Sequence, residues 1–385
     1  MTEKEKILDN YLLRIASNLD ISDTMREKAE TSYSAVGNWL SDCDAYSDVK
    51  IMPQGSFNLG TVIRPVSDAD EYDIDLVCLL INASYKDVFE IKNIVGNRLK
   101  ENETYRKMLQ KEGKRCWTLC YDNFHMDILP CVPNEAFYRE PNFTEIKLTH
   151  KLEDGTYIPK YSNPYKYHLW FEDRMKPQIV EFQKMLAEKN NVEIDKVPLY
   201  KIKTPLQRAI QLLKRHRDIM YNKMPKERKK NEPISIIITT LAAHAYNNES
   251  NLFEALNNIV SKMENYIKID GDTYKILNPV MPEENFADKW NTDPDKAKEF
   301  FYWLKCVKNE IITGPINAYG LNDLSEKLET CFGKDIVQRS FKEKAREIEN
   351  ARENNSLFVD GLNGGLQTSS TNTTKKVGGH TFFGN

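Results

Sequence analysis

Two short segments in the first third of the chain begin with alternating polar and apolar residues and then become apolar. They cover residues 71–79 and 124–129. Residues two apart in a strand share one face. Asp73 and Asp75 are therefore expected to project together, and Asp127 is expected to project from the second strand. The pattern predicts two strands that each have one buried face and carry carboxylates on the other.

Helical spacing of apolar residues predicts that helices surround these strands. An apolar run at 234–245 is shorter than the roughly 20 residues that a membrane span requires, so it is interpreted as a buried helix. A further strand is expected at 115–119. The other expected helices cover residues 3–18, 23–39, 85–100, 163–190, 294–312 and 322–352.

The clearest helix start is the sequence Thr204-Pro205-Leu206-Gln207. Threonine caps helices, proline suits the first helical position, and a glutamine three residues after the cap completes a capping box. Lys214 lies on a different face of this expected helix from its apolar stripe. The elements expected after the start of this helix are mainly helices.

The order of elements, with strands early and helices late, predicts an α+β fold. We expect a first lobe with a mixed sheet and helices at residues 1–200, and a helical lobe at 201–352. The active site is expected in the cleft between them. Residues 353–385 are rich in Gly, Ser, Thr and Asn. Such a composition buries too little apolar surface to order itself, so a flexible tail is expected.

Three carboxylates on neighbouring strands would repel one another unless a cation neutralised them. Such a set can hold two divalent metals about 3.5–4 Å apart, which stabilise the attacking and leaving oxygens of an in-line displacement. Mg²⁺ suits the set because it prefers oxygen ligands. Asp73, Asp75 and Asp127 are therefore candidate metal ligands and catalytic residues, and solvated aspartates on a strand edge are the alternative.

The segment upstream of the aspartates adds a phosphate site. Gly55 lets the backbone approach a ligand closely, and Ser56 can start a helical turn. Backbone N–H groups at such a turn bind phosphate oxygens. A Gly-Ser pair, a D-x-D pair and a distal aspartate in this order predict a site for a nucleoside triphosphate.

These residues resemble the nucleotidyltransferase core of the DNA polymerase β superfamily and, more narrowly, the bacterial cGAS/DncV-like nucleotidyltransferases. The likeness covers roughly residues 1–350. It implies a polymerase β-like nucleotidyltransferase lobe followed by a helical lobe similar to that of oligoadenylate synthases. The segments that carry it are 54–57, 60–65, 71–76, 125–130, 204–209, 212–218 and 278–290.

The resemblance also assigns roles to residues of the helical lobe. In the resembled family, a lysine and a serine of this lobe contact the donor triphosphate, and Lys214 and Ser235 match their positions. A solvated surface lysine and an ordinary helix cap are the alternative interpretations. The expected nucleotide-binding residues are Gln54, Gly55, Ser56, Lys214 and Ser235.

The activity implied by the resemblance is the joining of nucleoside triphosphates, with ATP expected among them, into a cyclic di- or trinucleotide. This second messenger would serve anti-phage defence of the CBASS type. Two Mg²⁺ ions are expected, with Mn²⁺ as a substitute, and Asp127 would also act as general base. Linear oligonucleotide synthesis and transfer of one nucleotide to RNA or protein are alternatives. A catalytically silent, nucleotide-sensing scaffold is an alternative of another class.

Composition and cysteine spacing bear on the compartment and the partners of the protein. The net charge of −3 over 385 residues gives no global basic field for nucleic acid. Seven cysteines, an odd number, favour a reducing compartment, and we expect the cytoplasm. The start of the chain lacks the apolar region of a signal peptide, and no membrane span is expected. No Cys/His spacing matches the zinc-bearing insertion of animal cGAS, so neither a zinc module nor a DNA activator is expected.

The last residues of the chain suggest a protein partner. Residues 380–385 contain two adjacent aromatic side chains at the end of the expected tail. In some bacterial operons of the resembled family, a ubiquitin-transfer-like enzyme conjugates the nucleotidyltransferase through its C-terminus. Such a conjugating enzyme is an expected partner, although Asn385 after Gly384 makes the match to a conjugated terminus imperfect.

Overall fold

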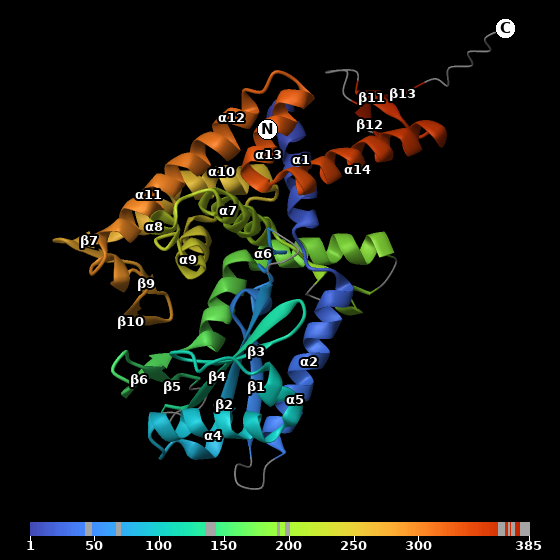
Figure 1. Ribbon diagram of the computed structural model, residues 1–385. Helices are drawn as coiled ribbons and strands as arrows, with labels where there is room; N and C mark the ends of the chain where they lie inside the picture. The colour runs from blue at the N-terminus through green and yellow to red at the C-terminus, as the bar shows by residue number, and fades with distance from the viewer. Residues whose placement is uncertain are drawn as a thin grey trace.

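The structure is a computed structural model in which a sheet with flanking helices lies beside a helical lobe (Figure 1). Across the described residues, no helix combines the length and apolar character needed to cross a bilayer. The described residues are 1–42, 48–66, 71–134, 144–190, 193–196, 201–360, 366–368, 370 and 374–377.

The sheet of the first lobe is mixed, as an α+β fold requires. Its strands run in the order β1-β2-β4-β5-β6. Strand β3 lies off this path and pairs with β4. The central strands β2 and β4 are parallel, and the other pairs are antiparallel. The strands are β1 (Val49–Gln54), β2 (Tyr72–Leu80), β3 (Trp117–Cys120), β4 (Phe124–Pro133), β5 (Ile146–Lys151) and β6 (Tyr157–Ser162).

Helices cover one face of this sheet. The apolar side chains of β2 and β4, among them Ile74 and Met126, are fully buried against α2 and α4. Figure 1 shows both helices beside the strands. The alternation in the sequence therefore predicted the buried face correctly. The helices of this layer are α2 (Asp23–Ser41), α4 (Val88–Glu101) and α5 (Glu103–Met108), and the short α3 (Gly55–Asn58) follows β1.

The second lobe is built around α7, whose buried face packs on several neighbouring helices. The capping box of Thr204 and Gln207 is present as predicted, with proline at the first helical turn. The helices of this lobe are α7 (Pro205–Asn222), α8 (Lys226–Lys229), α9 (Ser235–Ala245), α10 (Leu252–Lys262), α11 (Pro294–Val307), α12 (Gly314–Ile316), α13 (Leu321–Phe332) and α14 (Lys334–Glu353). Helix α6 (Pro164–Asn190) also packs into this core, although the expected boundary put it in the first lobe. Short strands β7 (Lys268–Asp270), β8 (Thr273–Lys275), β9 (Leu277–Asn278) and β10 (Met281–Asn285) connect α10 to α11.

The boundary between the lobes differs from the expected one at the N-terminus. Helix α1 (Glu3–Asn18) lies in sequence within the expected first lobe, yet Leu12 and Ile15 are fully buried in the core of the helical lobe. Figure 1 shows α1 beside α14. The apolar stripe of α1 predicted a helix, but a stripe does not specify which apolar surface it covers.

Two predictions for the last part of the chain need correction. The helix expected at 322–352 is divided into α13 and α14 by Gly333, whose φ of 93° is unsuited to a helix. The tail also contains a small three-stranded sheet of β11 (Phe358–Asp360), β12 (Leu366–Gln367) and β13 (Thr374–Lys376). The composition of the tail did not predict this sheet, because its strands are short and are anchored beside the buried Leu357. Residues 378–385, including the terminal aromatic pair, lie outside the described residues.

The two lobes are joined by hydrogen bonds to the carbonyls of the chain that follows α3. Gln207 Nε2 donates to Leu59 O at 3.0 Å, and Gln211 Nε2 donates to Val62 O at 2.9 Å. Lys203, Lys214 and Arg215 bind three other carbonyls of this segment, those of Gly60, Thr61 and Arg64. The segment between the phosphate turn and β2 is therefore fixed directly to the start of α7.

We predict that replacing the fully buried Gln211 by methionine destabilises the protein by about 1–3 kcal/mol. The change leaves Val62 O and Asp20 Oδ1 without their amide donor. Urea unfolding measures the loss. Gln183→Met, at a partly exposed glutamine of α6, is the control and should change the free energy of unfolding by less than about 0.5 kcal/mol. Equal effects of the two substitutions would contradict the importance of this contact.

Candidate active site

The parallel pair of β2 and β4 brings the three aspartates together. Asp75 lies directly opposite Asp127 in the register, and Asp73 lies opposite His125. The side chain of Asp73 is 70% exposed, whereas Asp75 and Asp127 are half-buried. Thr118 of the adjacent β3 donates a hydrogen bond to Asp127 Oδ1. The sequence therefore predicted correctly that these carboxylates share one face of neighbouring strands.

Gly55 brings the turn that follows β1 against this carboxylate cluster. Gln54, the last residue of β1, pairs with Asp75, and α3 begins at the next residue. Gly55 has a φ of 61°, and a Cβ atom there would clash with Asp75 Oδ2. Only glycine fits this contact without displacing the carboxylate. Gly55 and Ser56 therefore lie at the carboxylates, as a triphosphate site requires.

The carboxylates make the site strongly acidic. Burial, followed by the charges of Asp127 and Asp73, raises the pKa of Asp75 from 3.8 to about 7, and Lys214 opposes this shift. The pKa of Asp73 is also raised, first by loss of hydration and then by Asp127. Close carboxylates with raised pKa values form a site that a divalent cation would stabilise. The hard oxygen donors fit Mg²⁺.

Lys214 brings a positive charge from the helical lobe to these aspartates. Its side chain is 6% exposed, and Nζ donates to Thr61 O at 3.1 Å. Burial and the charge of Arg217 lower the pKa of Lys214 to about 8, and the charges of Asp218, Asp75 and Asp73 oppose that change. The interpretation of Lys214 as a solvated surface residue is therefore wrong.

Ser235 has a different setting from the one that the resemblance implies. It is the first residue of α9, but Ile234 is the N-cap and makes no side-chain capping bond. Ser235 Oγ accepts a hydrogen bond from Arg217 Nη1 at 2.9 Å. The structure therefore brings Ser235 to a guanidinium of α7, three residues after Lys214, and its contact with a triphosphate stays a prediction.

His125 is a neighbour of the site to which the sequence assigned no role. Its Nε2 lies 2.6 Å from Glu71 Oε2, and its Nδ1 lies 3.9 Å from Asp73 Oδ1. The alternation of β4 was a usable signal, because residues 125 and 127 share one face. Glu71 and His125 thus form one side of the carboxylate cluster.

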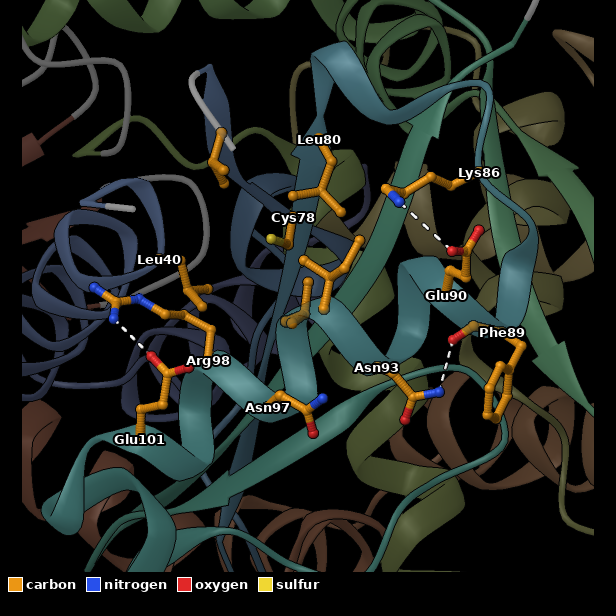
Figure 2. Close-up of a pocket in the computed structure, with 13 residues that line it drawn as sticks. Leu40, Cys78, Leu80, Lys86, Phe89, Glu90, Asn93, Asn97, Arg98 and Glu101 are labelled. Carbon is orange, nitrogen blue, oxygen red and sulfur yellow. Dashed lines mark hydrogen bonds and ion pairs between the residues drawn. The ribbon is translucent and has the colours of Figure 1, made fainter. Parts of the chain in front are cut away.

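A cavity of about 510 Å³ lies away from these residues (Figure 2). It is lined by Cys78 and Leu80 near the end of β2, about 10–17 Å along the strand from Asp75. Several of its polar side chains are paired with one another, including Lys86 with Glu90 at 3.5 Å. This cavity is therefore separate from the carboxylate site.

Comparison with known proteins identifies the family. Residues 7–150 match the Second Messenger Oligonucleotide or Dinucleotide Synthetase domain, SMODS. The chain is 32% identical over 356 residues to a c-di-GMP synthase of Roseivirga ehrenbergii, and the match covers 90% of each protein. This chain belongs to the cGAS/DncV-like nucleotidyltransferases, or CD-NTases. It is therefore an enzyme of the nucleotidyltransferase class, as the resemblance predicted.

Other relatives support the fold of this CD-NTase. The cyclic dinucleotide synthase CdnG of Bradyrhizobium diazoefficiens is 24% identical over 355 residues, covering 87% of this chain and 82% of CdnG. The structure of that CdnG with GTP has a TM-score of 0.68 at 23% identity, covering 88% and 99% of the two chains. Escherichia coli CdnC, in a complex with HORMA, has a TM-score of 0.57 at 16% identity and covers 84% and 96%.

We predict that Gly55→Ala lowers the rate of pyrophosphate release by about 100-fold, because the new methyl group displaces the Asp75 carboxylate. Gly271→Ala is the matched control. Gly271 has a φ of 58°, close to that of Gly55, but no atom lies within 4 Å of the position that its new methyl group would take. Both substitutions introduce similar backbone strain. Equal activities of the two variants would show that the contact with Asp75 is unimportant.

We predict a pH-dependent stability for the metal-free CD-NTase. Between pH 3.8 and about 7, folded Asp75 binds a proton that unfolded Asp75 has lost. The free energy of unfolding therefore falls as pH rises through this window and levels off above it. Asp75→Asn removes this contribution to the fall.

The measurement is urea unfolding in a chelator at about pH 5 and about pH 8. The stability of Asp75→Asn relative to the wild type should be greater at the higher pH. Asp122→Asn, at a carboxylate that is 94% exposed, should follow the wild-type profile. Parallel profiles of the wild type and Asp75→Asn would contradict the raised pKa.

Proposed function

We propose that this CD-NTase joins two nucleoside triphosphates, at least one of them GTP, into a cyclic dinucleotide second messenger. The observation that carries the proposal is the pairing of Asp75 with Asp127 beside Gly55, with Asp73 on the same face. The names of the two curated relatives, a c-di-GMP synthase and the cyclic dinucleotide synthase CdnG, support a dinucleotide containing guanine. ATP remains a candidate for the second substrate.

In this proposal, Asp73, Asp75 and Asp127 would hold a pair of Mg²⁺ ions, for which Mn²⁺ could substitute. The bound ions would neutralise phosphate charge and make the acceptor hydroxyl more acidic. Asp127 is the proposed acceptor of the hydroxyl proton, and Thr118 orients its carboxylate by the hydrogen bond to Oδ1. The negative charge of the cluster also excludes a free anion unless cations accompany it.

The proposed phosphate contacts come from both lobes. Gln54, Gly55 and Ser56 present the turn that begins α3, and its backbone N–H groups suit phosphate oxygens. Lys214, bound to Thr61 O just after the turn, supplies a buried positive charge suited to charge that develops on the leaving pyrophosphate. Ser235 would assist through the Arg217 side chain that it binds. The two lobes together would then hold the donor in line with the acceptor hydroxyl.

The cellular role that we propose is anti-phage signalling of the CBASS type in the cytoplasm. Seven cysteines suit a reducing compartment. The complex of the related CdnC with HORMA is an example of a CD-NTase with a protein partner. For this chain, conjugation of the C-terminus stays a prediction, because residues 378–385 lie outside the described part.

We predict that the double substitution Asp73→Asn/Asp75→Asn lowers pyrophosphate release from GTP and Mg²⁺ by about 1,000-fold or more. The fold should persist, because removing two close negative charges relieves repulsion in the cluster. Asp122→Asn is the control and should keep full activity. Wild-type activity in the double variant would overturn the assignment of the site.

The products of the four labelled nucleoside triphosphates, offered singly and in pairs, test the rest of the proposal. A cyclic product has no terminal phosphate, so phosphatase leaves it unchanged. Phosphatase removes the terminal phosphates of a linear oligonucleotide, and a nucleotide attached to RNA or protein migrates with its carrier, so chromatography after phosphatase treatment separates both from a cyclic product. A guanine-containing cyclic dinucleotide is expected. A product without guanine would overturn the choice of substrate. Absence of Mg²⁺-dependent turnover would favour a nucleotide-sensing scaffold.

A further inference from the structure

A second cluster of metal-binding side chains lies in the helical lobe. His216 of α7, Glu310 of the π-helix Lys308–Thr313 and Cys331 of α13 come together there. One ligand atom of each lies within 4.8 Å of the other two. His216 Nε2 is 3.1 Å from Glu310 Oε2. Three elements that are distant in sequence thus present imidazole, carboxylate and thiol groups to one small volume.

His216 is not explained by packing alone. Its side chain is only 1% exposed, and Nδ1 is buried without a hydrogen-bond partner among the described residues. Buried polar atoms in native proteins nearly always have a partner, because burying one without a partner is costly. The ring nitrogen that meets the cluster is the other one, Nε2, beside the Glu310 carboxylate, and it is the position of Nε2 next to a carboxylate and a thiol that points to a ligand at this ring.

Cys306 is the nearest further thiol. It lies four residues before Glu310, near the end of α11, and it is close enough to influence the pKa of the Glu310 carboxylate, although its sulfur is not among the three ligand atoms that lie within 4.8 Å of one another. The Cys331 thiol donates to the carbonyls of Glu310 at 3.3 Å and Lys327 at 3.2 Å. Glu310 therefore contacts His216 through its carboxylate and Cys331 through its backbone carbonyl.

The chemistry of this set differs from that of the aspartates. Two thiols and an imidazole are soft or intermediate ligands, which favour Zn²⁺ over Mg²⁺. Lys223 lies close enough to influence both Cys331 and Glu310, and its positive charge would offset the three anionic ligands.

We propose that His216, Cys306, Glu310 and Cys331 bind one Zn²⁺ ion that joins α7 to α11, the π-helix and α13. Four ligands of these types match a closed structural zinc site, with Zn–S and Zn–N distances of about 2.3 and 2.0 Å. On binding, each thiol loses one proton to solvent, and the neutral imidazole keeps the proton on its other nitrogen. The carboxylate of Glu310 is 46% exposed, which gives the ion a route of entry.

The local backbone is consistent with such a site. A π-helix widens one turn of a helix, and such turns are frequent at functional sites. Here the wide turn lies at Lys308–Thr313 and carries Glu310 toward His216. His216 is two residues after Lys214, which places the two side chains about 200° apart around α7. The zinc would hold the face of α7 that is turned away from the aspartates.

Zinc content tests the proposal directly. The full-length protein, stripped with a chelator, is incubated with ZnCl₂ and passed through a desalting column, and metal is measured by mass spectrometry. We expect about one zinc per chain in the wild type, and a loss of most of it in Cys331→Ser and His216→Gln. Cys116→Ser, at a partly exposed cysteine of the other lobe, is the control and should retain zinc.

Loading with CoCl₂ gives a second readout if a core variant fails to fold. A tetrahedral thiolate site gives cobalt–sulfur charge-transfer absorption, which should weaken in Cys306→Ser and Glu310→Gln, at two less buried positions. Zinc should also raise the melting temperature of the wild type and leave that of Glu310→Gln nearly unchanged. Equal zinc retention by the wild type and all four site variants would mean adventitious metal only and would overturn the proposal. So would the absence of retained zinc in the wild type.

Discussion

The joint between α7 and the segment 59–64 is the constraint on which the active site depends. The three clustered aspartates belong to the sheet, whereas Lys214 belongs to the helical lobe. Without a fixed joint, the distance between these charges would vary with every motion of the lobes. Gln207 and Gln211 prevent this, because their amides bind carbonyls of the segment that leads from α3 toward β2. These amides satisfy buried carbonyls without needing a counterion, and Lys203, Lys214 and Arg215 add charged donors to the same segment.

The packed sheet lets the protein keep an electrostatically unfavourable site. Asp75 combines a half-buried position with two neighbouring carboxylates, which is why its pKa reaches about 7. The apolar side chains of β2 and β4 are buried on the opposite face of the sheet and hold the strands in register. A slip of one residue would exchange the two faces. The core therefore fixes where the carboxylates lie, and a cation bound there would relieve the repulsion that remains.

Local patterns in the sequence predicted those parts of the molecule that depend on local rules. The alternation in β2 and β4 predicted the shared face of Asp73, Asp75 and Asp127 correctly, and the capping box at Thr204 predicted the start of α7. Features that depend on tertiary packing or on backbone conformation could not be predicted from such local patterns. The stripe of α1 does not say which lobe it covers. The break at Gly333 depends on a positive φ that helical periodicity does not reveal.

Helix α7 explains why a metal in the helical lobe would matter to chemistry in the other lobe. Along its length, residues 207, 211 and 214 repeat at helical spacing and face the joint and the aspartates. His216 lies about 180° from Gln207 around the helix axis and faces the π-helix and α13. A rotation or shift of α7 would move both faces together, because a helix is rigid over this length. Ligands on the far face would therefore restrict Lys214 as firmly as the amide contacts do on the near face, and the two sets of contacts would hold the charge of Lys214 in place from opposite sides.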